Sequence, residues 1–232
     1  IQKAVAGTQK RVSLELGGKS ANIVLEDAPI DQAVEGIVNG IFFNQGHVCC
    51  AGSRLYVQES IADELVRKLK QRMQSLYVGN PLDKNTDIGA INSKEQLETI
   101  EKYVSIGIKE GAEMFQVECD VPTKGFYCRP TIFTNVAQSS VIAQEEIFGP
   151  VLAVTTFKDE ADALAIANDT IFGLGSGVWT RDGSRAYRMG RGIKAGRVWT
   201  NCYHAYPAHA AFGGYKESGI GRETHKMMLD HY

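Results

Sequence analysis

The sequence predicts an α/β domain built on a largely parallel, twisted sheet that is flanked by helices. Apolar residues recur at helical spacing in several segments, and short β-rich runs separate these segments along most of the chain. The chain has 232 residues, 44% of them hydrophobic, which is enough for a sizeable core. In folds of this class, functional residues gather on loops at the strand ends.

Apolar periodicity predicts the helices. One spans 29–43, with Asp27 as its N-cap, and another opens at Ser60, where Asp63 completes a capping box. Three more are expected at Ser93 to Glu110, at Asp159 to Asn168 and, as a short run closed by Gly7, at Ile1 to Ala6.

The predicted strands are short and rich in β-branched residues. A first strand at Arg11 to Leu16 places Glu15 at a strand end, directly before Gly17 and Gly18. The others are expected at Ala21 to Leu25, Leu55 to Val57, Thr131 to Phe133, Val151 to Phe157, Gly177 to Thr180 and Val198 to Thr200. Because there is no internal repeat or linker-like segment, we expect one compact domain from about Leu16 to the end.

Charge and cysteine content exclude several classes of protein. The 25 basic and 27 acidic residues are interspersed and give a net charge of −2, so neither nucleic acid nor a membrane is expected as a partner. No apolar run approaches the roughly 20 residues of a membrane span. The five cysteines have no metal-ligand spacing, which predicts no metal site and favours reduced thiols in the cytoplasm.

Two adjacent thiols lie in a small-residue segment, 44–54, between a predicted helix and a predicted strand. A lone cysteine pair is most often buried filler, but a thiol becomes a nucleophile where a base or positive charge favours the thiolate. Glu15 is the candidate base, although a strand-edge carboxylate alone is more often structural. Cys49 or Cys50 is therefore a candidate nucleophile.

Two further segments carry chemistry-bearing residues. At 144–151, Glu146 could hold ribose hydroxyls and Phe148 could pack on a nicotinamide ring, or the segment could be a turn with an aromatic core plug. The glycine-rich segment 212–223 lacks the spacing of a phosphate-binding loop, so a tight structural loop is the better interpretation.

Taken together, these segments resemble the aldehyde dehydrogenase superfamily, in the family's order and from Arg11 to the last residue. Leu14-Glu15-Leu16-Gly17-Gly18-Lys19-Ser20 is similar to the family's glutamate motif and segment 44–54 to its cysteine motif. Segment 145–151 resembles its cofactor-ribose motif and segment 212–223 its C-terminal signature. One departure is His47, where the family usually has Gln or Glu.

The resemblance assigns roles by position. It implies Cys49 as the nucleophile and Glu15 as the general base, while Glu146 binds the ribose and Phe148 neighbours the nicotinamide of NAD or NADP. Asn201 matches a structural position near the active site. The residues that match the rest of the cofactor site and the loop lining the aldehyde pocket are Leu16, Gly17, Tyr203, His204, Tyr206 and Phe212.

The implied reaction oxidises an aldehyde to a carboxylic acid through a thiohemiacetal and a thioester on Cys49. The resemblance also implies that residues 1–15 end a Rossmann-like cofactor domain and that residues 16–232 form the catalytic domain. Most of the cofactor domain, an oxyanion-binding asparagine and the bridging strand for dimers or tetramers are expected outside this chain. This chain alone is then expected to lack aldehyde oxidation.

Three other functions stay open at this stage. A cofactor-independent thiol esterase or thioesterase would use Cys49 without NAD. A dehydrogenase that releases its product to coenzyme A would not need Glu15 as a base. A non-catalytic interaction module would use neither residue.

Overall fold

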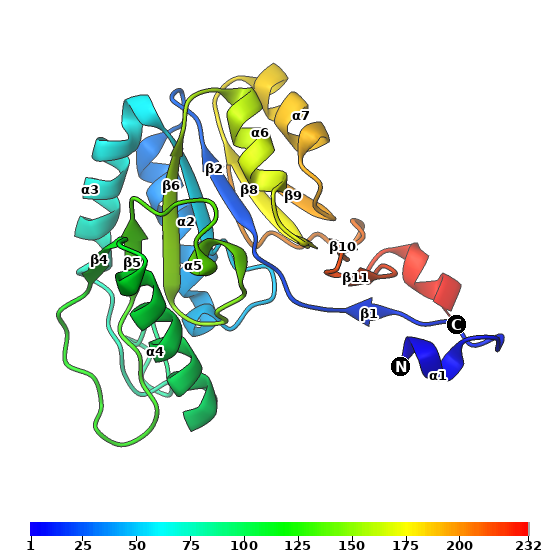
Figure 1. The fold of residues 1–232 in the computed structure, drawn as a ribbon, viewed down its shortest axis with the longest axis horizontal. Helices are drawn as coiled ribbons and strands as arrows, with labels where there is room; N and C mark the ends of the chain where they lie inside the picture. The colour runs from blue at the N-terminus through cyan, green and yellow to red at the C-terminus, as the bar shows by residue number, and fades with distance from the viewer. Residues whose placement is uncertain (232) are drawn as a thin grey trace.

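A seven-stranded sheet forms the centre of the molecule in the computed structural model, which describes residues 1–231 (Figure 1). Neighbouring strands are parallel, except that β4 pairs antiparallel with β5. This confirms the predicted α/β fold with a largely parallel sheet. In order across the sheet, the strands are β4 (Glu113–Gln116), β5 (Thr131–Thr134), β6 (Val151–Phe157), β3 (Arg54–Gln58), β2 (Ala21–Val24), β8 (Gly175–Trp179) and β9 (Arg197–Thr200).

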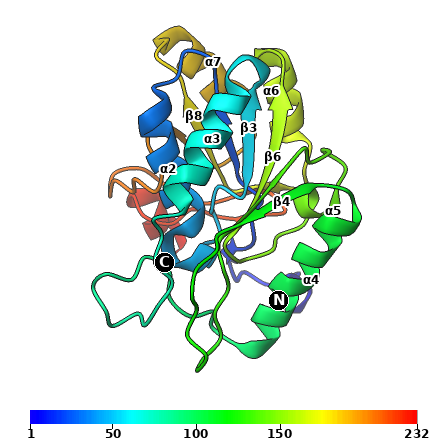
Figure 2. The same cartoon turned by 90° about the vertical axis from the view of Figure 1, so that its left-hand side faces the viewer.

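Helices cover both faces of this sheet (Figures 1 and 2). Alternate residues of a strand serve the two faces: Val24 packs with the α2 and α3 side, whereas Ile23 packs with the α6 and α7 side. Burial on both faces is typical of parallel strands. The helices are α2 (Ile30–Phe42) and α3 (Ala62–Met73) on one face, and α4 (Lys94–Lys109), α5 (Val141–Gln144), α6 (Glu160–Asn168) and α7 (Gly183–Gly192) on the other.

Three predicted helices, α2, α4 and α6, are confirmed to within about a residue at each end. Their caps differ in outcome. Ser93 accepts a hydrogen bond from the Gln96 amide at the start of α4, and Asp159 accepts from the Ala161 and Asp162 amides at the start of α6. Both are local interactions of a side chain with its own helix, and such interactions are readable from the sequence.

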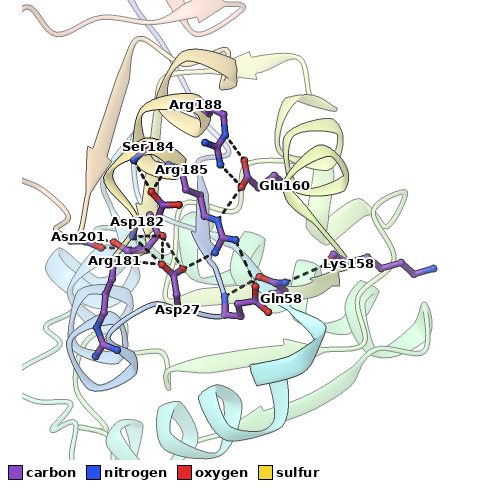
Figure 3. A network of polar contacts seen from close by, with 12 residues as sticks. Asp27, Gln58, Lys158, Glu160, Arg181, Asp182, Ser184, Arg185, Arg188 and Asn201 are labelled. Carbon is purple, nitrogen blue, oxygen red and sulfur yellow. Dashed lines mark hydrogen bonds and ion pairs between the residues drawn. The ribbon is translucent and has the colours of Figure 1, made fainter.

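Two predicted caps are wrong. Asp27 does not cap α2; its carboxylate accepts hydrogen bonds from the Thr180 hydroxyl and from two amides after β8 (Figure 3). Ser60 forms no capping box, because a 3₁₀ turn, η2 (Glu59–Ile61), precedes α3 and leaves Ile61 at the cap position. Asp27 is therefore not a helix cap, because the loop after β8, which is distant in sequence, binds its carboxylate.

The N-terminal segment extends away from the main sheet, to the lower right in Figure 1, and lies next to the C-terminal segment there. The expected strand at 11–16 is reduced to β1 (Leu14–Glu15), which pairs antiparallel with β11 (Gly219–Ile220). The remaining small elements are α1 (Gln2–Val5), the β7 (Phe172–Gly173) and β10 (Tyr215–Lys216) pair, the turn η1 (Phe43–Gly46) and η3 (Lys226–His231).

The loops that precede the parallel strands lie together at one end of the sheet, called here the amino end. They are segments 17–20 before β2, 43–53 before β3 and 145–150 before β6. A Cβ on Gly18 would clash with the Cys49 carbonyl, and one on Gly46 would clash with the Gly149 carbonyl. All three loops are therefore in backbone contact. Among the described residues, no helix is long and apolar enough to cross a membrane.

Candidate active site

The thiols lie on a strained turn at the end of α2. Asn44 and Gln45 adopt left-handed φ values of 50° and 48°, and Gly46 follows with φ 77°. Backbone strain of this kind persists only where the surroundings enforce it, and it gathers at functional sites. The turn carries Cys49 to the amino end of the sheet, where its thiol stays partly exposed, while Cys50 is buried.

Glu15 reaches the thiol turn from β1. The Glu15 carboxyl and the Cys49 thiol shift each other's pKa: interaction with the thiol lowers that of Glu15, and the carboxylate raises that of Cys49. The opposing strand β11 requires glycine, because Gly219 has φ +143° and a Cβ there would clash with the Leu14 carbonyl. The glycine-rich C-terminal segment therefore braces the strand that holds Glu15, and it is a tight loop, as the sequence favoured over a phosphate cradle.

The two cysteine thiols interact and titrate as a pair. Hydrogen bonding from Cys49 lowers the pKa of the Cys50 thiol, with further help from His204 and Tyr206. The same contact and burial raise the pKa of Cys49. These directions place the thiolate of the pair on Cys50, so the feature that favours Cys49 as the group that meets a substrate is its greater exposure.

The Glu146 carboxylate seats against the glutamate motif. The Gly18 amide donates to Glu146 Oε1 at 3.1 Å, and a Cβ on Gly17 would clash with the same carboxylate. Burial raises the pKa of Glu146, as it raises the pKa of Glu15. Leu16, next to Gly17, is exposed. The structure thus brings Glu146, Leu16 and Gly17 together beside the thiol turn.

Phe148 follows Glu146 in the same turn and has φ 56°, an uncommon value for a bulky residue. The side-chain amide of Gln96 donates to the Ile147 and Phe148 carbonyls at 3.0 and 3.1 Å and holds this turn. The ring stacks on His47 and remains 36% exposed. Gln96 was missed from the sequence, and its helical periodicity gave no signal for this contact.

The four aromatic residues expected to line an aldehyde pocket form one cluster. Tyr206 packs edge-on against Phe212 and stacks on His204, and Tyr203 contacts His204 at 4.9 Å between ring centroids. Tyr203 is buried and donates to the Cys50 carbonyl at 2.9 Å. The Tyr206 hydroxyl lies 2.9 Å from the Cys50 sulfur. The sequence did not single out Phe43 and Trp199, which also pack on His204.

Asn201 lies at the opposite end of the sheet from Cys49, where its side chain binds backbone groups. Its side chain accepts from the Thr180 amide and donates to the Thr180 carbonyl, close to Asp27 (Figure 3). A surface cavity of about 520 Å³ between α3 and the strands β5 and β6 also lies apart from the thiol turn, because Asp63, Arg67 and Thr155 line it. Neither feature joins the cluster around Cys49.

A partly exposed thiol, a carboxylate beside it and a second, half-buried carboxylate near an aromatic ring together define a candidate cysteine-dependent enzyme site on an α/β fold. Comparison with known proteins places this fold in a family. The family model described as "Aldehyde dehydrogenase family" matches residues 1–232. The chain belongs to the aldehyde dehydrogenase family.

Individual relatives agree with this assignment. An aldehyde dehydrogenase of Deinococcus radiodurans is 58% identical over 231 residues, which cover 95% of this chain and 44% of that protein. Acetaldehyde dehydrogenase 2 of Cupriavidus necator is 57% identical, over 95% of this chain and 46% of its own length. A crystal structure of betaine aldehyde dehydrogenase from Staphylococcus aureus with NAD+ superposes on all of this chain and 47% of its own, with a TM-score of 0.95 and 40% identity. The chain spans about half the length of these relatives.

Proposed function

We propose that this chain is the catalytic part of an enzyme that oxidises an aldehyde to a carboxylic acid with NAD or NADP. The observation that carries the proposal is the packing of three loops: the glutamate motif meets the Cys49 carbonyl at Gly18, and the thiol turn meets the Glu146–Phe148 turn at Gly46. A nucleophile, a base and a candidate cofactor surface then meet at one point. The names of the relatives support the same chemistry.

Cys49 acts as the nucleophile. Its thiolate sulfur bonds to the aldehyde carbonyl carbon, and the carbonyl oxygen becomes the oxyanion of a thiohemiacetal. Collapse of the oxyanion expels a hydride and leaves a thioester on Cys49. Cys49 is preferred to Cys50 because Cys50 is only 1% exposed and cannot reach a substrate.

Glu15 acts as the general base. A carboxylate beside the acyl-bearing sulfur can take a proton from water, whose oxygen then adds to the thioester carbon and releases the acid and the thiol. Burial raises the pKa of Glu15, which makes the carboxylate a stronger base at neutral pH than an ordinary glutamate. The same requirement argues against a dehydrogenase that transfers its acyl group to coenzyme A.

The residues beside the thiol suit a nicotinamide dinucleotide. Only Glu146 Oε1 receives the Gly18 amide, so the carboxylate keeps acceptor capacity for ribose hydroxyls, and Phe148 offers an exposed aromatic surface. Leu16 and Gly17 complete this surface. When bound, the nicotinamide supplies the acceptor for the hydride. The S. aureus relative with NAD+ supports this choice of cofactor.

We propose a small or medium aliphatic or aromatic aldehyde as substrate, on the basis of the aromatic cluster of Tyr203, His204, Tyr206 and Phe212. The acetaldehyde dehydrogenase of C. necator is consistent with the short end of that range. We further propose that residues 1–15 end the cofactor domain, that residues 16–232 form the catalytic domain, and that the full-length enzyme is a cytoplasmic homo-oligomer joined by a bridging strand outside this chain.

The proposal is tested with the full-length enzyme by following formation of reduced dinucleotide from a short aldehyde. Cys49→Ala should abolish this activity, while Cys50→Ala should retain most of it. Aldehyde oxidation that survives in Cys49→Ala would contradict the assignment. A thiol esterase without cofactor chemistry would instead hydrolyse an activated ester and give no reduced dinucleotide from any aldehyde.

A further inference from the structure

His47 lies two residues before Cys49 and has no role in the proposed reaction. Its imidazole nevertheless stacks face to face on Phe148, with ring centroids 5.2 Å apart and planes within 8°. The stack joins the turn that carries the nucleophile to the turn that carries the candidate nicotinamide neighbour.

The imidazole is held from other directions as well. The Asn92 amide donates to His47 Nε2 at 3.3 Å, and the side-chain amide of Asn44 donates to the His47 carbonyl at 3.0 Å. Since Nε2 accepts a hydrogen bond, the proton of the neutral ring sits on Nδ1, which is buried and has no hydrogen-bond partner among residues 1–231. Burial also lowers the pKa of His47, and interaction with the Phe148 backbone opposes that shift.

Phe148 needs such support. Its left-handed φ of 56° is unfavourable for a bulky residue, and its ring is 36% exposed, so the backbone alone does not fix the ring. Gln96 holds the carbonyl side of the turn, and His47 covers one face of the ring. An aromatic surface must be fixed in this way if it is to orient a second ring packed against it.

We propose that His47 is a positioning residue that sets the Phe148 ring relative to Cys49, and thereby places the nicotinamide over the thiol. This inference rests on the proposed function. Because His47 belongs to the thiol turn itself, the stack fixes the separation between nucleophile and hydride acceptor rather than the geometry of either alone. A reaction that needs only Cys49 and Glu15, such as ester hydrolysis without cofactor, does not depend on the stack of His47 on Phe148.

The test compares variants of the full-length enzyme in two assays, NAD-dependent aldehyde oxidation and cofactor-free hydrolysis of an activated ester. His47→Ala should raise the KM for NAD or lower the hydride-transfer rate by about 3- to 10-fold, the size of effect expected for an aromatic pair. Ester hydrolysis should stay within about 2-fold, since general base catalysis there needs only the thiol and carboxylate. His47→Phe keeps a ring on Phe148 and should restore most of the loss.

The matched control is Gln45→Asn, on the same turn. Asparagine tolerates the left-handed φ of this position, and the Gln45 side chain contacts Asn44 rather than Phe148. This variant should behave as the unaltered enzyme in both assays. The alkylation rate of Cys49 in each variant checks that the thiol turn is intact.

Three results would overturn the inference: unchanged oxidation in His47→Ala, a parallel loss of ester hydrolysis, or no recovery in His47→Phe. The first means that the stack is not needed, and the second that His47 supports the nucleophile instead. Failure of the unaltered enzyme to oxidise any aldehyde would contradict the proposed function, and with it this inference, so the two failures are distinguishable.

Discussion

The two ends of the central sheet use the same residue types in opposite ways. At the amino end, the carboxylates Glu15 and Glu146 lie near a thiol pair, and burial raises the pKa of each. At the opposite, carboxyl end, Asp27 and Glu160 bind two arginines (Figure 3). There, burial alone would raise the pKa of Asp27, but hydrogen bonds from the Thr180 loop and Arg185 outweigh it and lower the pKa. Hydrogen bonds from Arg188 and Arg185 likewise lower the pKa of Glu160.

The candidate site therefore lies at the amino end of the sheet, whereas sites in doubly wound sheets usually lie at the carboxyl end. Ligands of such sheets normally bind outside the carboxyl ends of neighbouring strands whose connections leave on opposite faces. One such pair here is β2 and β8, where the Asp27 carboxylate that follows β2 accepts hydrogen bonds from the amides of the loop after β8. The satisfied end stabilises the fold, and the end with strained turns and raised carboxylate pKa values carries the candidate chemistry.

The largest effect on activity is expected from a substitution at the amino end of the sheet. Glu15→Gln in the full-length enzyme should slow hydrolysis of the thioester by about 100-fold or more, as expected for loss of a general base. The unfolding midpoint in denaturant should change little, because Glu15 is exposed and a neutral amide of the same size is accommodated there. Rapid mixing that follows acyl-enzyme decay measures this step. Near-normal decay would assign the base elsewhere.

The carboxyl end should respond in stability instead. Asp27→Ala removes the acceptor for the Arg181 amide, for the Thr180 hydroxyl and for one nitrogen of Arg185, and should cost about 1.5–3 kcal/mol of unfolding free energy. Asp31→Ala is the matched control, because its ion pair with Lys68 is solvent-exposed and should contribute little to stability. Urea unfolding of the 232-residue chain measures both. Equal values for the two variants would contradict a structural role for the Asp27 network.

A smaller loss of activity is expected at the cofactor surface. Glu146→Gln should weaken dinucleotide binding or hydride transfer by about 10-fold, since a charged acceptor for hydroxyls becomes neutral. Alkylation of Cys49 should persist at its ordinary rate. An unaltered cofactor affinity together with an unaltered hydride-transfer rate would reduce Glu146 to a turn residue.

The smallest effect is the pH dependence of stability. Asp27 and Glu160 have lowered pKa values, so their contribution is present above the ordinary carboxyl pKa and is lost as pH falls through the folded-state value. Glu146 has a raised pKa, so its neutral form favours folding at low pH and that contribution disappears as pH rises. Asp27→Ala should therefore flatten the acid loss of stability, while Glu146→Gln should not lower stability at neutral pH.

Local signals explain which elements could be predicted. The helices α4 and α6 were found because Ser93 and Asp159 cap their own helices and apolar residues follow at helical spacing. The helix α7 was missed because three glycines interrupt its pattern, although Asp182 caps it and Tyr187 and Met189 follow. The edge strand β4 is short and largely exposed, so it has no clear alternation.

The candidate site depended on a different kind of information. Spacing alone could not bring Glu15 to Cys49, because pairing of β1 with β11 joins opposite ends of the chain. The resemblance to a family supplied that contact in advance. Two contacts join residues that are far apart in the sequence: His47 stacks on Phe148, and Asp27 binds the loop after β8. No local sequence pattern predicts either contact.

The most direct test of the account is to measure which thiol reacts first. Limited iodoacetamide labelling of the 232-residue chain at neutral pH, followed by peptide mapping, compares all five cysteines under one condition. Cys49 is expected to be modified before Cys50, Cys119, Cys128 and Cys202, because it is partly exposed whereas Cys50 and Cys128 are buried, and because it lies beside the candidate base Glu15. Preferential labelling of Cys50, or of a cysteine away from the amino end of the sheet, would contradict it.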